Sequence, residues 1–177
     1  LAGSRAGGLH AGTIEVLAQL REIPDPLTTF DVLANPRTDS TQSPLRQHVE
    51  ANKRWLHWAT NGVGSPLIDA CFEWLEAHWS ESESEAVVSW GDARIGNVMY
   101  RDFEPVAVLD WEMAALAPSE IDLAWFIYLH RFFDELAVDL GVPGLPDFIR
   151  RDRVEAAFAE RTGHQPQDMD WYLMYAA

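Results

Sequence analysis

Hydrophobic residues follow a helical period over most of this chain. Apolar side chains at three- and four-residue spacing predict helices over residues 13–23, 44–59, 66–79, 119–139 and 150–162, and from Asp168 onward. The pairs Ser43–Pro44 and Ser65–Pro66 are typical of an N-cap followed by the first helical turn. The Gly-rich residues 1–12 are assigned no structure, and the polar residues 24–43 are expected to form a surface loop. The last helix is still apolar at Ala177, which favours a fragment.

The period changes after the acidic residues 80–85. Val87 and Val88, residues 98–100 and residues 106–109 predict short strands joined by tight connections. The chain is therefore predicted to be α+β and mainly helical, with a short β-hairpin among the helices.

Length, charge and composition limit the classes of function that this chain can have. A length of 177 residues allows one ordinary domain. The formal charge is 13 − 28 = −15, which excludes sequence-independent electrostatic binding to nucleic acid phosphates. An acidic chain of this kind suits a cationic substrate, a divalent metal or simply solubility. One cysteine, Cys71, cannot form an internal disulfide, and no apolar run approaches the roughly 20 residues that span a bilayer. We expect a cytoplasmic protein that binds neither membrane nor nucleic acid, of undetermined oligomeric state.

Candidate chemistry is concentrated in residues 90–97, Trp-Gly-Asp-Ala-Arg-Ile-Gly-Asn. Asp92 stands five positions before Asn97, and Asp110 follows Asn97 by thirteen positions, beyond the predicted hairpin. Kinases use this layout for phosphoryl transfer, with one carboxylate for the attacking hydroxyl and an amide and a second carboxylate for Mg²⁺. Hard oxygen ligands suit that metal.

Other interpretations of these residues stay open. Asp92 is alternatively a turn residue that caps its loop, and Asp110 alternatively only ends a strand. Arg94 fits an ion pair with a nearby carboxylate as well as a contact to substrate or phosphate. Glu112 fits either a support of the metal site or a solvated loop. The eight tryptophans fall mostly at helical core positions, with the alternative that one of them lines a substrate cleft.

The same stretch resembles the aminoglycoside phosphotransferase and choline kinase family. The signature of that family is His-Gly-Asp-x-x-x-x-Asn, followed by a strand ending Ile-Asp-Trp-Glu or similar. In this chain the corresponding strand end is Val-Leu-Asp-Trp-Glu, at residues 108–112. Glu-Ile-Asp-Leu-Ala at residues 120–124 is similar to the Asp-Leu-Ala segment of that family. The resemblance is strongest to one branch of the family, which includes kinase-like domains fused to some acyl-CoA dehydrogenases. That branch has an Arg two residues after the loop Asp, and Arg94 holds the same position relative to Asp92. The likeness covers most of the chain and is strongest over residues 87–126.

The resemblance implies a mechanism. Asp92 would orient or deprotonate the substrate hydroxyl, with Arg94 as a second catalytic residue, while Asn97 and Asp110 would hold Mg²⁺ bound to ATP. Asp122 would be structural and accept backbone N–H bonds from the catalytic loop. The implied protein is an ATP-dependent kinase for a hydroxyl of a small molecule, and the implied fold is the C-terminal lobe of a protein-kinase-like fold.

Two departures from the family pattern have consequences. Trp90 replaces the family's His, which is expected to remove a polar support of the loop. The N-terminal ATP-binding lobe is absent, so residues 1–177 are expected to be the C-terminal, substrate and catalytic lobe. The only lysine, Lys53, lies in a helical pattern and cannot be the strand lysine that pairs with phosphate. A catalytically silent, kinase-like binding module is therefore the competing function.

Overall fold

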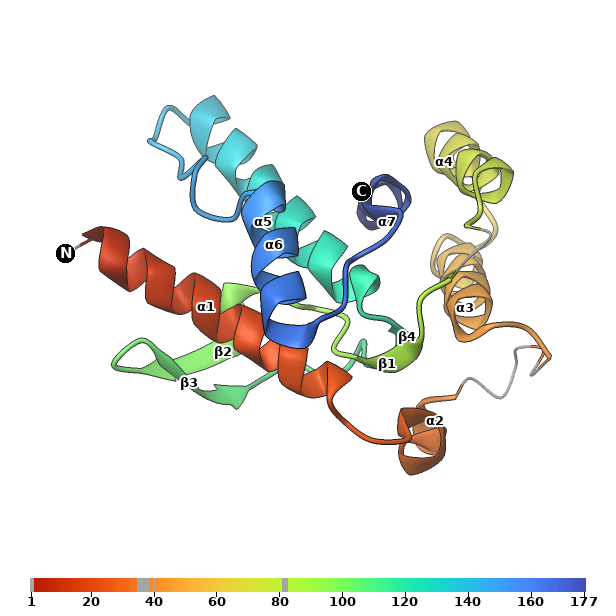
Figure 1. The fold of residues 1–177 in the computed structure, drawn as a ribbon. Coiled ribbons are helices and arrows are strands. Elements are labelled where there is room, and N and C mark those ends of the chain that lie inside the picture. Colours follow the sequence, from red (N-terminus) through yellow and green to blue (C-terminus); the bar gives the residue numbers. More distant parts are fainter. Residues whose placement is uncertain (1, 35–38, 40, 81–82) are drawn as a thin grey trace.

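Helices form most of the molecule, and two small antiparallel sheets lie beside them, toward the bottom of Figure 1. The structure is a computed structural model that describes residues 2–34, 39, 41–80 and 83–177, with side chains from residue 7 onward. Its elements in chain order are α1 (Ala2–Arg21), α2 (Pro26–Thr29), the 3-10 turn η1 (Asp31–Leu33), α3 (Pro44–Ala59), α4 (Pro66–Ala77), β1 (Ala86–Ser89), the 3-10 turn η2 (Ile95–Asn97), β2 (Val98–Arg101), β3 (Glu104–Val108), β4 (Ala115–Pro118), α5 (Glu120–Asp139), α6 (Arg151–Thr162) and α7 (Met169–Ala176).

The two sheets bring the predicted site loops together. Strands β2 and β3 form the predicted hairpin, with Val98 opposite Val108. Strand β1 pairs with β4, so that Ala86 lies opposite Pro118. The loop after β1 leads into β2, and the loop after β3 leads into β4, the partner of β1. Because β2 follows the first loop directly, both loops lie at the hairpin.

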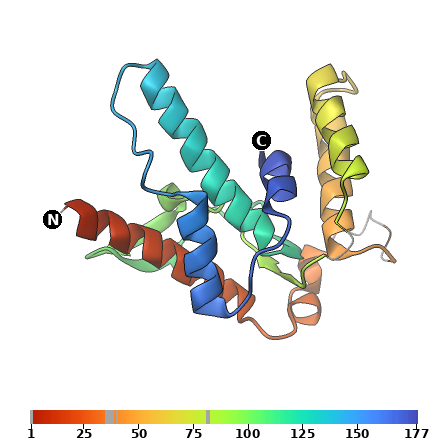
Figure 2. The ribbon, with the colours of Figure 1, turned by 45° about the horizontal axis from the view of Figure 1, so that its top comes forward.

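The helices build the core around this strand region. Helix α5 packs against α7 and α6, and α1 packs against α6 and β3, while α3 and α4 lie side by side at the other end of the molecule (Figures 1 and 2). Arg46 and Lys53 of α3 both pair with Glu76 of α4, at 2.6 Å each. Trp90, in the loop after β1, and Phe158 of α6 are fully buried in the hydrophobic core.

The fold class predicted from the sequence is confirmed, and several local expectations are wrong. Helix α1 begins at Ala2, within residues that were assigned no structure from the sequence, and α2 and η1 lie within the expected loop. Strand β4 was not expected. Ser43 caps α3 by accepting a bond from the Arg46 backbone N–H at 3.2 Å, whereas Ser65 makes no such bond.

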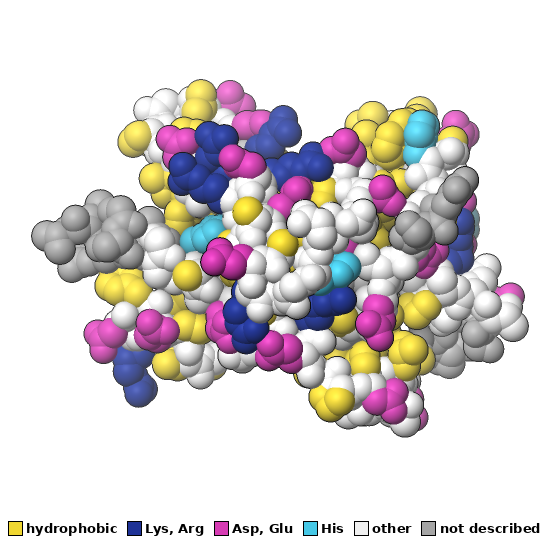
Figure 3. Space-filling view, in the orientation of Figure 1, with side chains coloured by type: hydrophobic (Ala, Val, Ile, Leu, Met, Phe, Trp, Pro, Cys, Tyr) yellow, Lys and Arg dark blue, Asp and Glu magenta, His cyan; other side chains and the backbone are white. Residues whose placement is uncertain are grey.

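Surface properties differ from expectation in one respect. Trp55 and Trp58 of α3 are 63% and 74% exposed, although tryptophans were predicted to be mostly core. Acidic and basic side chains intermingle on the face shown in Figure 3. Ion pairs are one reason, since Arg161 binds Glu15 and Glu22 at 2.6 Å each. Among the described residues, every helix is too short or too polar to cross a membrane.

Candidate active site

The loop that follows β1 is held by a buried carboxylate of α5. Asp122 Oδ2 accepts the Trp90 backbone N–H and Oδ1 accepts the Gly91 N–H, both at 2.8 Å. Ser89 Oγ donates to the same carboxylate at 3.0 Å. Burial raises the pKa of Asp122 to about 6, and the three hydrogen bonds oppose that rise. The backbone contacts expected of Asp122 are therefore present.

Gly91 gives this loop its shape. Its φ is 90°, in a region that side-chain-bearing residues rarely adopt, and a Cβ there would lie 2.4 Å from the Met113 carbonyl oxygen. The loop after β1 can approach the segment after β3 this closely only because residue 91 has no side chain.

Asp92 follows Gly91 and is surrounded by donors. Its Oδ2 accepts Asn97 Nδ2 at 2.6 Å and Arg94 Nε at 2.9 Å. Its Oδ1 accepts the Trp125 indole N–H at 2.8 Å. The Asp92 side chain keeps 14% of its surface exposed. The carboxylate is thus held by three side chains while one edge remains open to solvent.

Asn97 links this loop to the one after β3. It is 6% exposed, and its amide nitrogen donates to Asp92. Its backbone carbonyl accepts the Leu109 N–H at 2.8 Å, which places the residue before Asp110 beside it. Because the amide nitrogen is committed to Asp92, the amide oxygen is the atom left to bind a cation.

Asp110 begins the second loop in a left-handed conformation. Its φ is 63°, and its side chain is exposed. Non-glycine residues rarely adopt this region, and Asp is among those that tolerate it. Trp90 Nε1 donates to the backbone carbonyls of Leu109 and Asp110, at 2.9 and 3.1 Å. Trp90, which stands where the family has His, therefore supports the second loop directly through its indole N–H.

The donor set fits Mg²⁺. Asn97 and Asp110 each offer a hard oxygen on adjacent loops, and Mg²⁺ is commonly held by one or two protein oxygens, with phosphate oxygens and water completing the shell. The described residues contain no group of three or more His, Cys, Asp or Glu side chains arranged for a metal. Lys53 lies on α3, paired with Glu76 and Glu50. Its place on a helix is the one that its helical pattern predicted.

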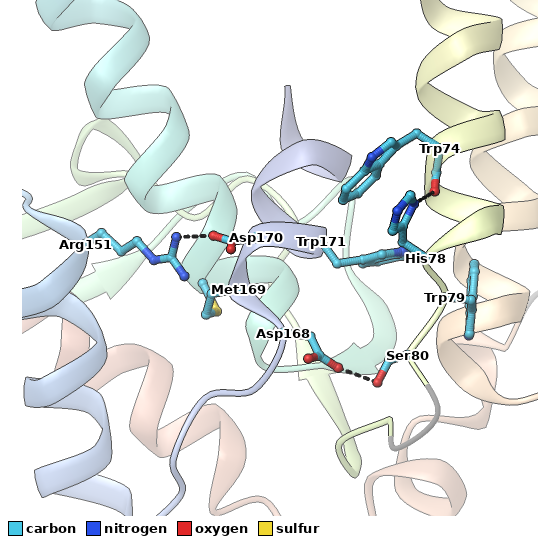
Figure 4. Close-up of a pocket in the computed structure, with 9 residues that line it drawn as sticks. All are labelled: Trp74, His78, Trp79, Ser80, Arg151, Asp168, Met169, Asp170 and Trp171. Carbon is cyan, nitrogen blue, oxygen red and sulfur yellow. Dashed lines mark hydrogen bonds and ion pairs between the residues drawn. The ribbon is translucent and has the colours of Figure 1, made fainter.

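Two cavities elsewhere do not include the candidate residues. One of about 520 Å³ is lined on one side of α7 by Trp74, His78 and Trp171 and on the other by the Arg151–Asp170 ion pair (Figure 4). The other, of about 940 Å³, lies between α3 and α4. The predicted site therefore lies at the loops of the β2–β3 hairpin, outside both cavities.

The structure brings the four predicted residues into one region and adds a fifth. Asp92, Asn97 and Arg94 are in direct contact. Asp110 is joined to them through the Trp90 indole, which donates to its carbonyl, and through the neighbouring Leu109 N–H, which donates to the Asn97 carbonyl. Trp125 was not singled out from the sequence. A usable signal was its position three residues after Asp122, since residues at that spacing share a helix face.

Known proteins are similar in sequence to this chain. A sequence model described as the phosphotransferase enzyme family matches residues 2–171. The chain is 28% identical over 159 residues to acyl-CoA dehydrogenase family member 10 of Mus musculus, covering 83% of this chain and 14% of that protein. It is 24% identical over 116 residues to family member 11 of the same organism, covering 63% and 15%. The chain thus spans about one seventh of these relatives.

Solved structures share the fold. A candidate aminoglycoside phosphotransferase from Ralstonia eutropha JMP134 superposes with a TM-score of 0.71 at 19% identity, covering 98% of this chain and 53% of that one. The macrolide 2′-phosphotransferase MphH from Brachybacterium faecium gives 0.62 at 17% identity, covering 97% and 52%. The predicted kinase-like fold is confirmed, and the chain corresponds to about half of each solved protein. With its family match over residues 2–171, this chain belongs to the phosphotransferase enzyme family.

Proposed function

We propose that this chain is the catalytic lobe of an ATP-dependent phosphotransferase that acts on a hydroxyl of a small molecule. The observation that carries the proposal is the contact between Asp92 and Asn97, at 2.6 Å, beside a loop that presents Asp110. A proton acceptor and two oxygen ligands for a cation then stand together. Phosphoryl transfer needs this combination of positioning and charge neutralisation, and little covalent chemistry from the protein.

Each residue has a role in this proposal. Asp92 orients the acceptor hydroxyl and takes its proton. Asn97 and Asp110 supply oxygens to Mg²⁺, which neutralises phosphate charge when bound. Arg94 donates through Nε to Asp92, and its remaining guanidinium N–H groups extend from a side chain that is 41% exposed. They can therefore approach the transferred phosphoryl group while Arg94 holds Asp92.

In this proposal the enzyme consists of two lobes. Residues 1–177 supply the substrate and catalytic lobe, and the ATP-binding lobe stands outside them. We place the protein in the cytoplasm, with a hydroxylated small molecule as partner and neither nucleic acid nor membrane.

A catalytically silent binding module is the second candidate. The observation that favours it is Lys53, the chain's only lysine, which is committed to Glu76 and Glu50. Within these residues no lysine is left to pair with phosphate.

One assay separates the two. The full-length protein containing this chain is incubated with Mg²⁺, radiolabelled ATP and a panel of hydroxylated metabolites, beside its Asp92→Asn variant. We expect label transfer to at least one metabolite class in the wild type and a loss of roughly 10² to 10⁴ in rate in the variant. ATP binding with no transfer to any acceptor would favour the silent module.

A further inference from the structure

The two oxygens of the Asp92 carboxylate are not equivalent. Each oxygen of a carboxylate can accept about two hydrogen bonds. Oδ2 already accepts two, from Asn97 Nδ2 and Arg94 Nε. Oδ1 accepts one, from Trp125 Nε1, among the residues that the structure describes. The remaining acceptor position of Asp92 is therefore on Oδ1, beside the indole.

Trp125 is fixed by the same helix that fixes the loop. It lies in the second turn of α5, three residues after Asp122, whose carboxylate binds the Trp90 and Gly91 backbone. The indole also lies 6.2 Å from the Tyr128 ring, measured between ring centroids. Helix α5 thus holds the loop backbone through one side chain and the Asp92 carboxylate through another. A rigid element that fixes both parts limits rotation of the carboxylate.

We infer that Trp125 is a positioning residue of the phosphotransfer site, which orients Asp92 so that the acceptor hydroxyl approaches Oδ1. This inference rests on the proposed function. The hydroxyl proton passes to Asp92 Oδ1, and the hydroxyl oxygen forms a bond to the γ-phosphorus of ATP. The bond from that phosphorus to the β,γ-bridging oxygen breaks, and its electron pair leaves with ADP. Trp125 transfers no atom and keeps its N–H.

Substitution can separate the donor from the ring. Trp125→Phe keeps an aromatic ring, smaller than the indole, and removes the N–H, so Asp92 gains a rotation that the wild type lacks. Misplacement of a reacting group typically costs about 10- to 100-fold in rate. We expect kcat to fall by that amount, with KM for the acceptor and for ATP changed by less than about threefold, because the lost interaction acts on orientation.

A matched control is present in the chain. Trp79 Nε1 donates to the Glu83 carboxylate at 2.7 Å, the same kind of hydrogen bond at a place remote from the loops. Trp79→Phe removes it and should leave kcat near wild type. A kcat of Trp125→Phe equal to that of Trp79→Phe would overturn the inference.

A measurement without turnover tests the contact itself. In the full-length protein labelled with ¹⁵N-tryptophan, Trp125→Phe assigns the Trp125 indole signal. Asp92→Asn should then move that proton upfield, because a hydrogen bond to a charged acceptor becomes one to a neutral acceptor. Glu83→Gln should move the Trp79 signal and leave that of Trp125 in place. An unmoved Trp125 signal in Asp92→Asn contradicts this inference alone, whereas absence of phosphotransfer in the wild type contradicts the proposed function.

Discussion

The indole nitrogen of Trp90 donates to the backbone carbonyl of Asp110 across 3.1 Å, and so connects the two loops of the candidate site. The same N–H is shared with the Leu109 carbonyl at 2.9 Å. Trp90 is fully buried, and its own backbone N–H is bound by Asp122. One residue thus holds the first loop through its backbone and the second through its side chain.

Removing the Trp90 donor should therefore disturb the second loop. Trp90→Phe removes the donor to the Leu109 and Asp110 carbonyls and shortens a fully buried side chain, and we expect a loss of about 1–3 kcal/mol in unfolding free energy. Mg²⁺ dependence should also shift to higher concentrations, because Asp110 loses its support. Urea unfolding and Mg²⁺ titration of activity measure the two effects.

Trp171→Phe is the control for that variant, since Trp171 Nε1 donates to the Leu75 carbonyl at 3.0 Å outside the site. It should lose similar stability and keep the wild-type Mg²⁺ dependence. An equal shift in both variants would show that the effect of Trp90 is only on stability.

The two carboxylates should have separable roles. Asp110→Ala is expected to raise the Mg²⁺ requirement and weaken ATP binding together, because the phosphates are held through the ion. Asp92→Asn should retain Mg-ATP binding while kcat falls by roughly 10² to 10⁴. Steady-state kinetics and nucleotide titrations on the full-length protein distinguish them. A loss of ATP affinity in Asp92→Asn equal to that of Asp110→Ala would place Asp92 among the metal ligands.

Residues 1–177 by themselves should bind ATP weakly and transfer no phosphate. In the proposed division into two lobes, about half of the nucleotide contacts would come from outside these residues, so they alone would not offset the entropy lost when ATP is positioned. Isothermal calorimetry with Mg-ATP measures this. Micromolar affinity for the isolated chain would contradict the division into two lobes.

Gly91→Ala should destabilise the site loop. The new Cβ would meet the Met113 carbonyl oxygen at 2.4 Å, and φ of 90° disfavours alanine as well. We expect a loss of more than about 1 kcal/mol in unfolding free energy. Gly7→Ala in α1 is the control, because nothing lies within 4 Å of its added Cβ, and it should gain about 0.5–1 kcal/mol. Thermal unfolding compares the two, and equal stability would contradict the close contact at Gly91.

Acidification should weaken the packing of α3 against α7. Burial lowers the pKa of His48 from 6.5 to about 4. His48 Nε2 lies 3.2 Å from Asn52 Nδ2, and Asn52 also donates to the Tyr175 hydroxyl. The unfolded chain binds a proton at residue 48 below pH 6.5 while the folded chain does not. Stability should therefore fall as the pH drops from about 6.5 to about 4, by up to about 3 kcal/mol.

Urea unfolding across that pH range measures the slope. His48→Gln should flatten it, and His57→Gln, which changes an exposed histidine of the same helix, should not. A wild-type slope unchanged by His48→Gln would contradict the burial of a neutral imidazole.

Several elements were predictable because their signals are local. The pair Ser43–Pro44 marks the start of α3, and apolar spacing marks α5 and α6. Residues 2–12 were missed because glycine lowers helix propensity. Packing overrides this, since Gly12 lies against Pro105 so closely that a Cβ would be 3.0 Å from Pro105 Cδ. Strand β4 was missed because Ala115–Pro118 lacks alternation and ends in proline, and it forms only through pairing with β1.

The sequence by itself determined which residues form the candidate site. The spacing of Asp92, Asn97 and Asp110, with a hairpin between the last two, needs only local strand and turn preferences to bring their loops together. Tertiary structure alone decided how these residues are held. Trp125 reaches Asp92 across 33 positions, and Trp90 reaches Asp110 across 20. Such contacts depend on how α5 and the hairpin pack and on the side-chain rotamers that the packed core permits. The pattern of residues along the chain indicates neither of these.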